Sequence, residues 1–299
     1  MFSDATRLER IQAVRERTVF FVGGPAKSGT TWLQHLLDAH PQAACRGEGH
    51  LSRALLPMMK RALEQYTQRV QQYNKGLFKE TAGFPTLDGD DLGFIVATTA
   101  ALLLGRIVED DPGITAVGEK TPANIREYPL LQWCFPESRL VCIVRDPRDA
   151  FLSNWHQTRR VNPQWLESQY GGSMQSFAAD YGKRWTDWVG QGLKMAELRP
   201  QRVRFVRYED LHTEPLVTLQ PVFTMLGLDA EMSTVEACVQ RASFQRLSGG
   251  RSAGQADGAS FFRKGVVGDG QRELPTDAAA AVTAPARDLM GRFGYAVGG

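Results

Sequence analysis

The chain has 299 residues, of which 42% are hydrophobic and 23% charged, and its formal net charge is +2. This balance is typical of a soluble globular protein and excludes attraction to nucleic acid through overall charge, so any anion would bind at a local site. The cysteines show no Cys-x-x-Cys pair and no metal-binding spacing with histidine; they are Cys45, Cys134, Cys142 and Cys238. We therefore expect core cysteines in a reducing compartment and no metal site.

Residues 1–17 are charged and helical in pattern, and they lack the apolar stretch and small-residue cleavage site of a secretory signal. The most apolar later segment, Phe94–Leu104, contains two threonines and is too short to span a bilayer. We expect it to be a core helix. These features predict a soluble, cytoplasmic protein with no transmembrane segment.

The segment Thr18–Leu37 predicts a strand, a tight turn and a helix in direct succession. Val19–Val22 is the apolar strand, Gly23–Pro25 is the turn, and the helix is expected to begin near Ser28. Backbone N–H groups of the loop and the positive end of the helix dipole then converge on one point. This junction is therefore predicted to bind an anion.

The loop in this segment differs from an ordinary nucleotide-binding loop. Gly24 and Gly29 have the spacing of the Walker A motif, but Thr30 stands where that motif requires lysine. The lysine lies inside the loop instead, at Lys27, and Trp32 follows soon after. The sequence therefore predicts a loop that holds a phosphate-like group in a different way from a nucleoside triphosphatase.

Charged residues follow the next expected strands. The strand Ala43–Cys45 leads into Arg46–His50, and the strand Ala116–Gly118 leads into Glu119–Pro122. Strand ends of this kind carry the reacting groups of α/β folds, although a solvated turn is the alternative.

The clearest central strand is Arg139–Val144, a continuous apolar run of the kind found in parallel sheets. It ends in Arg145, and a helix is expected over Ala150–Gln157. Arg148 and Asp149, just before this helix, are expected to form local ion pairs that contribute little to stability.

The remaining chain alternates between regular and irregular segments. We expect a helix over Leu51–Leu63, an irregular insertion or lid over residues 64–92, and a strand over Arg202–Val206. Residues 248–260 are expected to form a flexible loop, and Asp277–Phe293 the C-terminal helix.

Repeated strand–turn–helix units occur without an internal repeat and without a linker between two cores. They predict an α/β fold, with one P-loop-like domain over residues 1–299 in which helices flank a mostly parallel sheet. Residues 1–17 would form a helical extension of this domain.

Segments far apart in the chain resemble the sulfotransferases that use 3′-phosphoadenosine 5′-phosphosulfate (PAPS). Lys27–Trp32 is similar to the 5′-phosphosulfate loop of that family. Arg145 with Ser153, eight positions later, is similar to its 3′-phosphate pair. Tyr208-Glu209-Asp210 resembles a motif whose tyrosine lies near the adenosine.

A fourth segment, Arg263-Lys264-Gly265 followed by Gly268 and Asp269, resembles the late segment that closes on the 3′-phosphate. The resemblance extends from Val19 to Asp269, which is nearly the whole chain. Taken in order, the four segments imply the fold and the activity of this family.

The resemblance implies PAPS as co-substrate, adenosine 3′,5′-bisphosphate as product, and no required metal. Such a nucleotide needs two anion sites, one a backbone cradle with a lysine and the other a cluster of arginine and lysine. Trp32 and Phe244 are placed like the adenine-stacking aromatics of the family, and core packing is their alternative role. The implied nucleotide-binding residues are Lys27, Ser28, Gly29, Thr30, Thr31, Trp32, Arg145, Ser153, Tyr208, Phe244, Arg263, Lys264 and Gly265.

The chain departs from the cytosolic branch of this family, whose base is the histidine of a Lys-Thr-His motif. Here the corresponding residues are Lys120-Thr121-Pro122. Other branches, among them the Golgi-type enzymes and many bacterial ones, use a glutamate shortly after the first helix, and Glu48 stands there. The resemblance therefore implies Glu48 as general base; His50 is the alternative, because an ordinary histidine titrates nearer neutrality.

Sulfonyl transfer is expected to pass through a loose, charge-rich transition state, so that positioning and electrostatics supply most of the catalysis. Lys27 would stabilise charge on the leaving phosphate. Lys120 would act at the sulfonyl oxygens, unless it is only a surface lysine in a turn. Together with the helix N-terminus, the two lysines would supply the positive field that magnesium supplies in kinases.

Two other functions remain as alternatives. A P-loop kinase or nucleoside triphosphatase would need lysine at position 30 and a carboxylate after an apolar strand, where this chain has Arg145. A non-catalytic nucleotide-binding relative is the second, and the presence of Lys27, Lys120 and Glu48 argues against it.

The acceptor is expected to be a small molecule, a glycan or a peptide with a hydroxyl group or an amine, and no nucleic acid partner is expected. Neither the identity of the acceptor nor the oligomeric state follows from the sequence. Candidate side chains for an apolar acceptor pocket are Leu55, Met58, Phe84, Phe94, Trp155 and Trp165.

Overall fold

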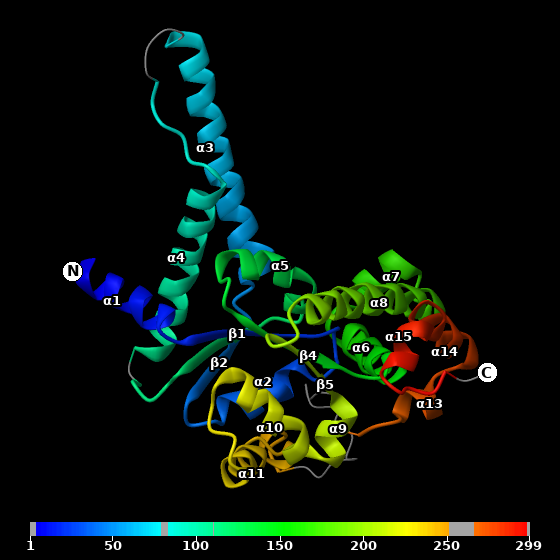
Figure 1. Ribbon diagram of the computed structural model, residues 1–299. Helices are drawn as coiled ribbons and strands as arrows, with labels where there is room; N and C mark the ends of the chain where they lie inside the picture. Colours follow the sequence, from blue (N-terminus) through cyan, green and yellow to red (C-terminus); the bar gives the residue numbers. More distant parts are fainter. Residues whose placement is uncertain (1–3, 79–82, 110, 251–265, 298–299) are drawn as a thin grey trace.

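The computed structural model describes residues 4–78, 83–109, 111–250 and 266–297, without the side chains of Asp4 and Phe244. Its centre is a five-stranded sheet with the order β2-β3-β1-β4-β5, in which every neighbouring pair is parallel (Figure 1). The strands are β1 Thr18–Gly23, β2 Ala43–Gly47, β3 Ala116–Lys120, β4 Arg139–Val144 and β5 Val203–Arg207. The predicted α/β fold with a parallel sheet is confirmed.

Helices pack on both faces of this sheet. Their bounds are α1 Asp4–Arg15, α2 Thr30–Asp38, η1 Leu51–Leu55, α3 Leu56–Leu77, α4 Gly89–Val108, α5 Asn124–Cys134, α6 Pro147–Val161, α7 Pro163–Tyr170, α8 Met174–Leu198, α9 Tyr208–Thr213, α10 Pro215–Leu226, α11 Met232–Arg241, α12 Phe244–Leu247, α13 Asp269–Glu273, α14 Thr276–Thr283, η2 Ala284–Ala286 and α15 Arg287–Arg292.

Alternate residues of the central strands supply two separate cores. In β1, Phe21 belongs to a cluster with apolar residues of α1, α4 and α5, whereas Phe20 and Val22 belong to a cluster with α2, α10 and α11. Because side chains of a strand alternate between the faces of the sheet, a continuous apolar run is needed where both faces are covered. All three side chains are 0% exposed, as this arrangement requires.

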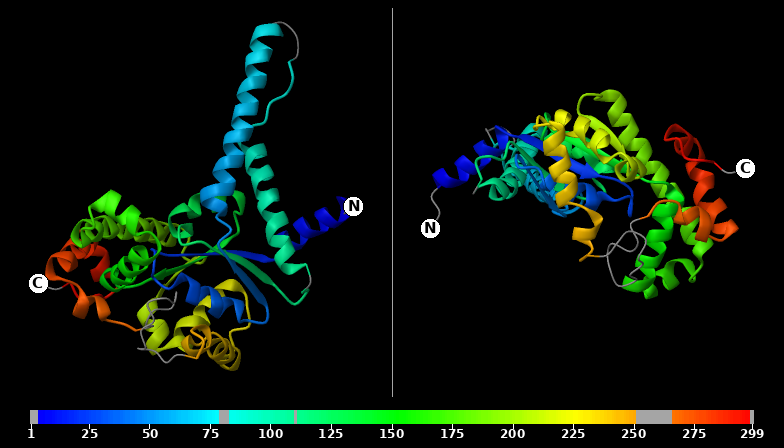
Figure 2. Two further views of the ribbon diagram at one scale, coloured as in Figure 1. Left: turned by 180° about the vertical axis from the view of Figure 1, so that it is seen from behind. Right: turned by 90° about the horizontal axis from the view of Figure 1, so that it is seen from below.

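The structure over residues 64–92 differs from the predicted irregular insertion. The helix α3 continues from Leu56 to Leu77 and projects from the body of the protein, as Figures 1 and 2 show. Its far end is tied to the returning chain by Asn74, whose side chain donates to and accepts from the backbone of Phe84 at 2.8 and 3.0 Å. The expectation of irregular structure over residues 64–77 was therefore wrong.

The helix expected over Phe94–Leu104 is longer, and it begins with a capping box formed by Asp88 and Asp91. Its 20 residues, Gly89–Val108, are long and apolar enough to cross a membrane by length and composition. However, 44% of its most apolar window is buried inside the protein, and it packs against α1 and α3. The prediction of a core helix holds for this buried face, although the estimate of its length was too short.

The C-terminal helix predicted over Asp277–Phe293 is divided in three. The helix α14 ends at Thr283, a short 3-10 helix contains Pro285, and α15 follows. Proline has no N–H to donate within a helix, so a break at this point is expected. Most of the loop predicted over residues 248–260 lies outside the described residues.

Candidate active site

The carboxyl ends of all five strands meet at one edge of the sheet, and β1 is hydrogen-bonded to both β3 and β4. From β1 the chain passes first to β2 and β3 on one side, and then to β4 and β5 on the other. In open α/β sheets, ligands bind at the carboxyl edge where the strand order reverses in this way. The loop after β1, residues 24–29, lies at that point. We call it the phosphate loop, after the role that the sequence predicts for it.

The loop between β1 and α2 depends on its two glycines. At Gly24, a Cβ atom would lie 2.3 Å from the carbonyl oxygen of Ile143 on β4. At Gly29, φ is +99°, and a Cβ atom would lie 2.5 Å from the ring of Tyr208. Lys27 also has a positive φ, 68°, although it is not glycine. The loop is therefore pressed against β4 and Tyr208 in a conformation that favours glycine.

The same loop presents polar groups that have no partner in the part of the chain that the structure describes. The hydroxyl oxygen of Ser28 is buried and forms no hydrogen bond among the described residues. The N-terminus of α2 has Gly29 as its N-cap and receives no side-chain cap. A buried hydroxyl and free N–H groups at a helix N-terminus suit an anion such as a phosphate. The side chain of Lys27 donates to the Gln157 side chain on α6.

Arg145 joins this loop to the residues after β4. Its guanidinium carbon lies 4.3 Å from the ring centroid of Tyr208, and it donates to the carbonyl oxygens of Val266 at 2.9 Å and Lys27 at 3.5 Å. Its Nε is buried and has no partner among the described residues. The structure therefore brings Arg145, Tyr208 and the phosphate loop together. Ser153 lies further along α6 and is partly buried.

Arg148 and Asp149 form the predicted local ion pairs, with Asp146 and Arg145, but both residues are buried, which the sequence did not indicate. Arg148 is 8% exposed and forms two hydrogen bonds with the Asp146 carboxylate, at 3.0 and 2.6 Å. Asp149 is 2% exposed and accepts hydrogen bonds from the backbone N–H groups of Gly268 at 2.7 Å and Gly270 at 2.6 Å. Asp149, four residues after Arg145, thus holds Gly268 and Gly270 of the late segment against α6.

Among the residues predicted for the 3′-phosphate, Arg263, Lys264 and Gly265 lie outside the described residues. Gly268 and Asp269, which follow them, are described, and Gly268 has a φ of 86°. The described part of the late segment is therefore positioned beside Arg145 through Asp149 and Val266.

An aromatic cluster lies beside the loop. The ring of Trp32 contacts Tyr208 edge-on at 5.5 Å and His212 at 4.7 Å between centroids, and its Nε1 donates to the Ala242 carbonyl oxygen at 3.0 Å. Burial raises the pKa of Tyr208. Trp32 is partly buried against the core, so packing accounts for part of its role. The side chain of Phe244 is outside the described residues.

His212 did not emerge from the sequence. Burial, aided by the charge of Arg145, lowers its pKa to about 4, so the imidazole is neutral near pH 7. Its spacing of four from Tyr208 on α9 was the available signal, since residues four apart share one face of a helix.

Glu48, Lys120 and His50 lie together at the carboxyl ends of β2 and β3. The Lys120 Nζ is 2.5 Å from Glu48 Oε1, and Lys120 is 4% exposed, so it is not a surface lysine. The side chain of Glu48 is 39% exposed, and its Oε2 lies 3.7 Å from Nε2 of His50. A buried cation therefore holds one carboxylate oxygen while the rest of the carboxylate faces solvent.

Gly47 brings this group close to the phosphate-loop helix. A Cβ atom at Gly47 would lie 2.8 Å from Oε1 of Gln34, on α2, and 3.4 Å from Nζ of Lys120. Gln34 lies one turn beyond Thr30, the first residue of α2. The Lys120–Glu48 pair is therefore next to the helix whose N-terminus belongs to the phosphate loop.

Glu119 is a second site residue, one to which the sequence assigned no role of its own. It is 4% exposed, and its carboxylate accepts hydrogen bonds from the Gly49 N–H at 2.8 Å and from the Asn124 side chain at 2.8 Å, as well as from the Thr121 hydroxyl. Its place in the charged segment directly after the expected strand Ala116–Gly118 was the available signal, and the structure extends this strand to Lys120. Its partner Gly49 is 70 residues away, which sequence patterns do not show.

The six side chains expected to form an acceptor pocket are not brought together. Met58, on the projecting helix α3, is 71% exposed, and Phe84, on the chain returning from the far end of that helix, is 65% exposed. Trp155 is buried in a core beside Phe177. Phe94 lines a cavity at the amino edge of the sheet, together with Thr18. The structure therefore does not support that pocket.

Comparison with known proteins gives one consistent result. The sequence model of the Sulfotransferase family matches residues 20–232. Cytosolic sulfotransferase 17 of Arabidopsis thaliana is 26% identical over 285 residues, which are 88% of this chain and 71% of that protein. Cytosolic sulfotransferase 1 of the same plant is 27% identical over 151 residues, 46% of this chain and 45% of that protein.

Two solved structures share the fold. Mouse sulfotransferase SULT7A1, solved in complex with PAP, superposes with a TM-score of 0.55 at 19% identity, covering 97% of this chain and 91% of that chain. Sulfotransferase STF9 from Mycobacterium avium also has a TM-score of 0.55, at 13% identity, covering 99% of this chain and 82% of that chain.

Proposed function

Because the chain belongs to the sulfotransferase family, we propose that it transfers a sulfonyl group from PAPS to a hydroxyl group or an amine of an acceptor. The observation that carries this proposal is the Lys120–Glu48 ion pair, 2.5 Å between Nζ and Oε1, beside the helix of the phosphate loop. This arrangement places a carboxylate that can accept a proton next to an anion site that can hold PAPS, the sulfonyl donor.

The residues present fit the nucleotide. The buried Ser28 hydroxyl and the uncapped N-terminus of α2 would hold the 5′-phosphosulfate, with Lys27 beside them. Arg145, whose buried Nε has no partner among the described residues, would hold the 3′-phosphate with Ser153. When bound, PAPS supplies the sulfonyl group, and adenosine 3′,5′-bisphosphate is the product that remains. Trp32 and Tyr208 would contact the adenine.

Glu48 acts as the general base in this proposal. Its Oε1 is held by Lys120, so Oε2 is the oxygen that takes the proton from the acceptor as the acceptor's oxygen or nitrogen attacks sulfur. Lys27 and Lys120 place positive charge where negative charge develops on the leaving phosphate and on the sulfonyl oxygens. His50, 3.7 Å from Glu48, is the alternative base.

The competing functions are weaker. A kinase or nucleoside triphosphatase would place lysine at position 30, where the chain has a nearly buried threonine, 6% exposed. A non-catalytic relative would have no need of a carboxylate paired with a buried lysine beside the anion site. We also propose that the chain forms a single domain and acts on an acceptor with a hydroxyl group. We propose a cytoplasmic location because the two relatives named above are cytosolic sulfotransferases.

The test is an acceptor screen with labelled PAPS, followed by kinetics of Glu48→Gln, His50→Ala and the control Glu64→Gln. We expect Glu48→Gln to lower kcat by about 100-fold or more, the usual range for loss of a general base. Adenosine 3′,5′-bisphosphate should still raise the melting temperature of that variant. The control, on the projecting helix α3, should behave like the wild type.

Other results would change the assignment. Near-normal turnover in Glu48→Gln with a large loss in His50→Ala would make His50 the base. Tight bisphosphate binding without sulfonated product from any acceptor would indicate a non-catalytic protein. Binding of ATP with magnesium but not of the bisphosphate would favour the kinase.

A further inference from the structure

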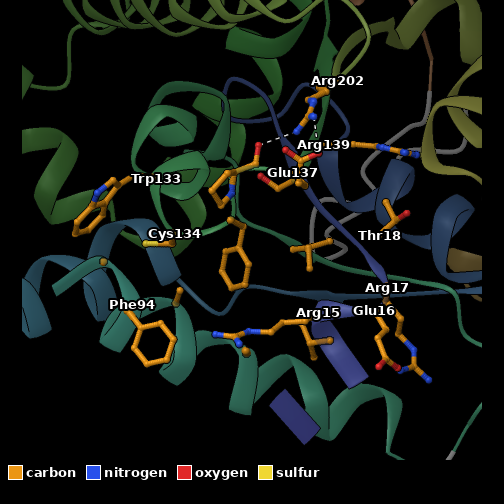
Figure 3. A pocket seen from close by; sticks show the side chains of 18 of the residues that line it. Arg15, Glu16, Arg17, Thr18, Phe94, Trp133, Cys134, Glu137, Arg139 and Arg202 are labelled. Carbon is orange, nitrogen blue, oxygen red and sulfur yellow. Dashed lines mark hydrogen bonds and ion pairs between the residues drawn. The ribbon is translucent and has the colours of Figure 1, made fainter. Parts of the chain in front are cut away.

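A cavity of about 760 Å³ lies at the amino edge of the sheet, opposite the phosphate loop (Figure 3). It is bounded by the end of α1, the start of β1, one side of α4, the end of α5, and the turns before β4 and β5. The parallel strands separate it from the candidate active site, because their amino ends share one edge and their carboxyl ends the other. Its volume is within the range of small-molecule sites, about 300–1,000 Å³.

Exposed aromatic rings form one side of this cavity. Phe94 on α4 is 59% exposed and Trp133 on α5 is 38% exposed, and both line the cavity. A Cβ atom at Gly93 would lie 2.9 Å from the Trp133 ring, so the glycine allows this ring to lie against α4 beside Phe94. The two rings, which come from different helices, lie on the same side in Figure 3. Both rings present apolar surface to the cavity.

One positive charge, that of Arg15, lies next to the Phe94 ring. The guanidinium carbon of Arg15 lies 5.3 Å from the Phe94 ring centroid, and Figure 3 shows the side chain extending toward that ring. Arg15 forms no ion pair within the described part of the chain. Arg139 lies on the other side of the cavity in Figure 3, and its guanidinium donates to the carbonyl oxygen of Met225. The Arg15 guanidinium would therefore gain from a nearby anion.

Most of the other charged groups of the cavity already have partners. Arg202 is paired with Glu137 at 2.5 Å, and Arg17 donates to the carbonyl oxygens of Ala13 and Ile114. Glu16 accepts a hydrogen bond from Gln12. Asp90 also lines the cavity, one turn of α4 before Phe94, and contributes a negative charge on that side. Among the arginines of the cavity, Arg15 is therefore the best placed to pair with an anion on an aromatic ligand.

We propose that this cavity is a second binding site, separate from the site of sulfonyl transfer, for an amphipathic aromatic anion. The aromatic ring lies between Phe94 and Trp133, and a carboxylate, sulfate or phosphate group on it pairs with Arg15. An aromatic ring contributes through burial, and the charge-assisted hydrogen bond selects the anion over its neutral analogue.

The probe is 2-naphthoate, titrated calorimetrically into the full chain saturated with adenosine 3′,5′-bisphosphate, with methyl 2-naphthoate as the uncharged comparison. We expect one saturable site for 2-naphthoate. Arg15→Glu should weaken it at least about tenfold and leave the methyl ester unchanged. Phe94→Ala should weaken both compounds. The control Arg61→Glu, an equal charge change on exposed α3, should alter neither.

Both cavity variants should keep the wild-type rate of sulfonyl transfer and the wild-type melting temperature, because both side chains are exposed and remote from the active site. Absence of saturable 2-naphthoate binding up to millimolar concentration would overturn the proposal. So would binding that is equally tight in Arg15→Glu and the wild type, which would place the compound in the acceptor site instead.

Discussion

The carboxylate of Glu119, inside β3, accepts a hydrogen bond from the backbone N–H of Gly49, with 2.8 Å between Oε1 and N. Gly49 is the residue directly after Glu48. The loop that carries the proposed base is therefore held by a buried group on the neighbouring strand, and Asn124 holds the second carboxylate oxygen of Glu119 at 2.8 Å. Movement of Glu119 would displace Glu48 relative to Lys120.

Replacement Glu119→Gln tests this relationship. The amide replaces one acceptor oxygen by a donor, which would then face an N–H group of Gly49 or Asn124 in a buried site. We expect the free energy of unfolding to fall by about 1–3 kcal/mol. We also expect kcat to fall about tenfold or more, with little change in the KM for PAPS. Denaturant unfolding and steady-state kinetics measure the two effects.

The exposed replacement Glu64→Gln serves as control for Glu119→Gln. An unchanged kcat in a destabilised Glu119→Gln protein would show that Glu119 supports only the fold.

Gly29→Ala should damage the phosphate loop. Alanine would be strained at a φ of +99°, and its Cβ would lie 2.5 Å from the Tyr208 ring. We expect a lower melting temperature and at least about tenfold weaker binding of adenosine 3′,5′-bisphosphate, since the ring or the loop must move. In contrast, Gly76→Ala on α3 meets no atom within 4 Å and should stabilise that helix by up to about 1 kcal/mol. Equal effects of the two substitutions would contradict this account.

Arg145→Lys keeps the charge but loses the planar fork that stacks on Tyr208 at 4.3 Å and donates to Val266. If Arg145 holds the 3′-phosphate, the affinity for adenosine 3′,5′-bisphosphate should fall at least about tenfold. The affinity for adenosine 5′-phosphate, which lacks the 3′ group, should change much less. Calorimetric titration with both nucleotides measures the difference, and an equal loss for both would reject the assignment.

The pH dependence of stability should contain a contribution from His212. Its pKa in the folded state is lowered to about 4 by burial, whereas an unfolded histidine titrates near 6.5. As the pH falls from about 6.5 toward 4, the unfolded chain takes up a proton that the folded chain does not, so stability falls across this window. His212→Gln should remove this part of the loss.

Denaturant unfolding of both proteins at several pH values checks the His212 prediction. His35 and His40, whose pKa values are also lowered by burial, remain in both proteins and cancel in the comparison. Identical pH dependence of the wild type and the variant would contradict the prediction.

The sequence was most informative where local pattern and topology coincide. Val19–Val22 and Leu140–Val144 are apolar runs that only a strand covered on both faces explains, and parallel strands necessarily bring their carboxyl ends together. The structure adds that β2 and β3 are neighbours, which brings Glu48, directly after β2, next to Lys120 at the end of β3.

Other features depend on contacts that no local pattern contains. Glu119 and Asp149 are carboxylates, which are usually exposed, and their burial is satisfied by N–H groups 70 and more than 100 residues away. The second part of α3, residues 64–77, was missed because its residues are mostly polar. However, glutamine, lysine, arginine and glutamate are good helix formers, so α3 can continue with little core contact.

The hydrogen-bonded order β3-β1-β4 fixes the lateral spacing of the residues at the ends of these strands. Lys120 ends β3 and is level with Val141 of β4, so the sheet places these two backbones two strand spacings apart, about 10 Å, and Arg145 follows four residues after Val141. The phosphate loop, which follows β1, lies between them. The distance between the regions of Lys120 and Arg145 is therefore set by the pairing of the backbone. Substitutions of these two side chains can weaken nucleotide binding without changing the length of nucleotide that fits.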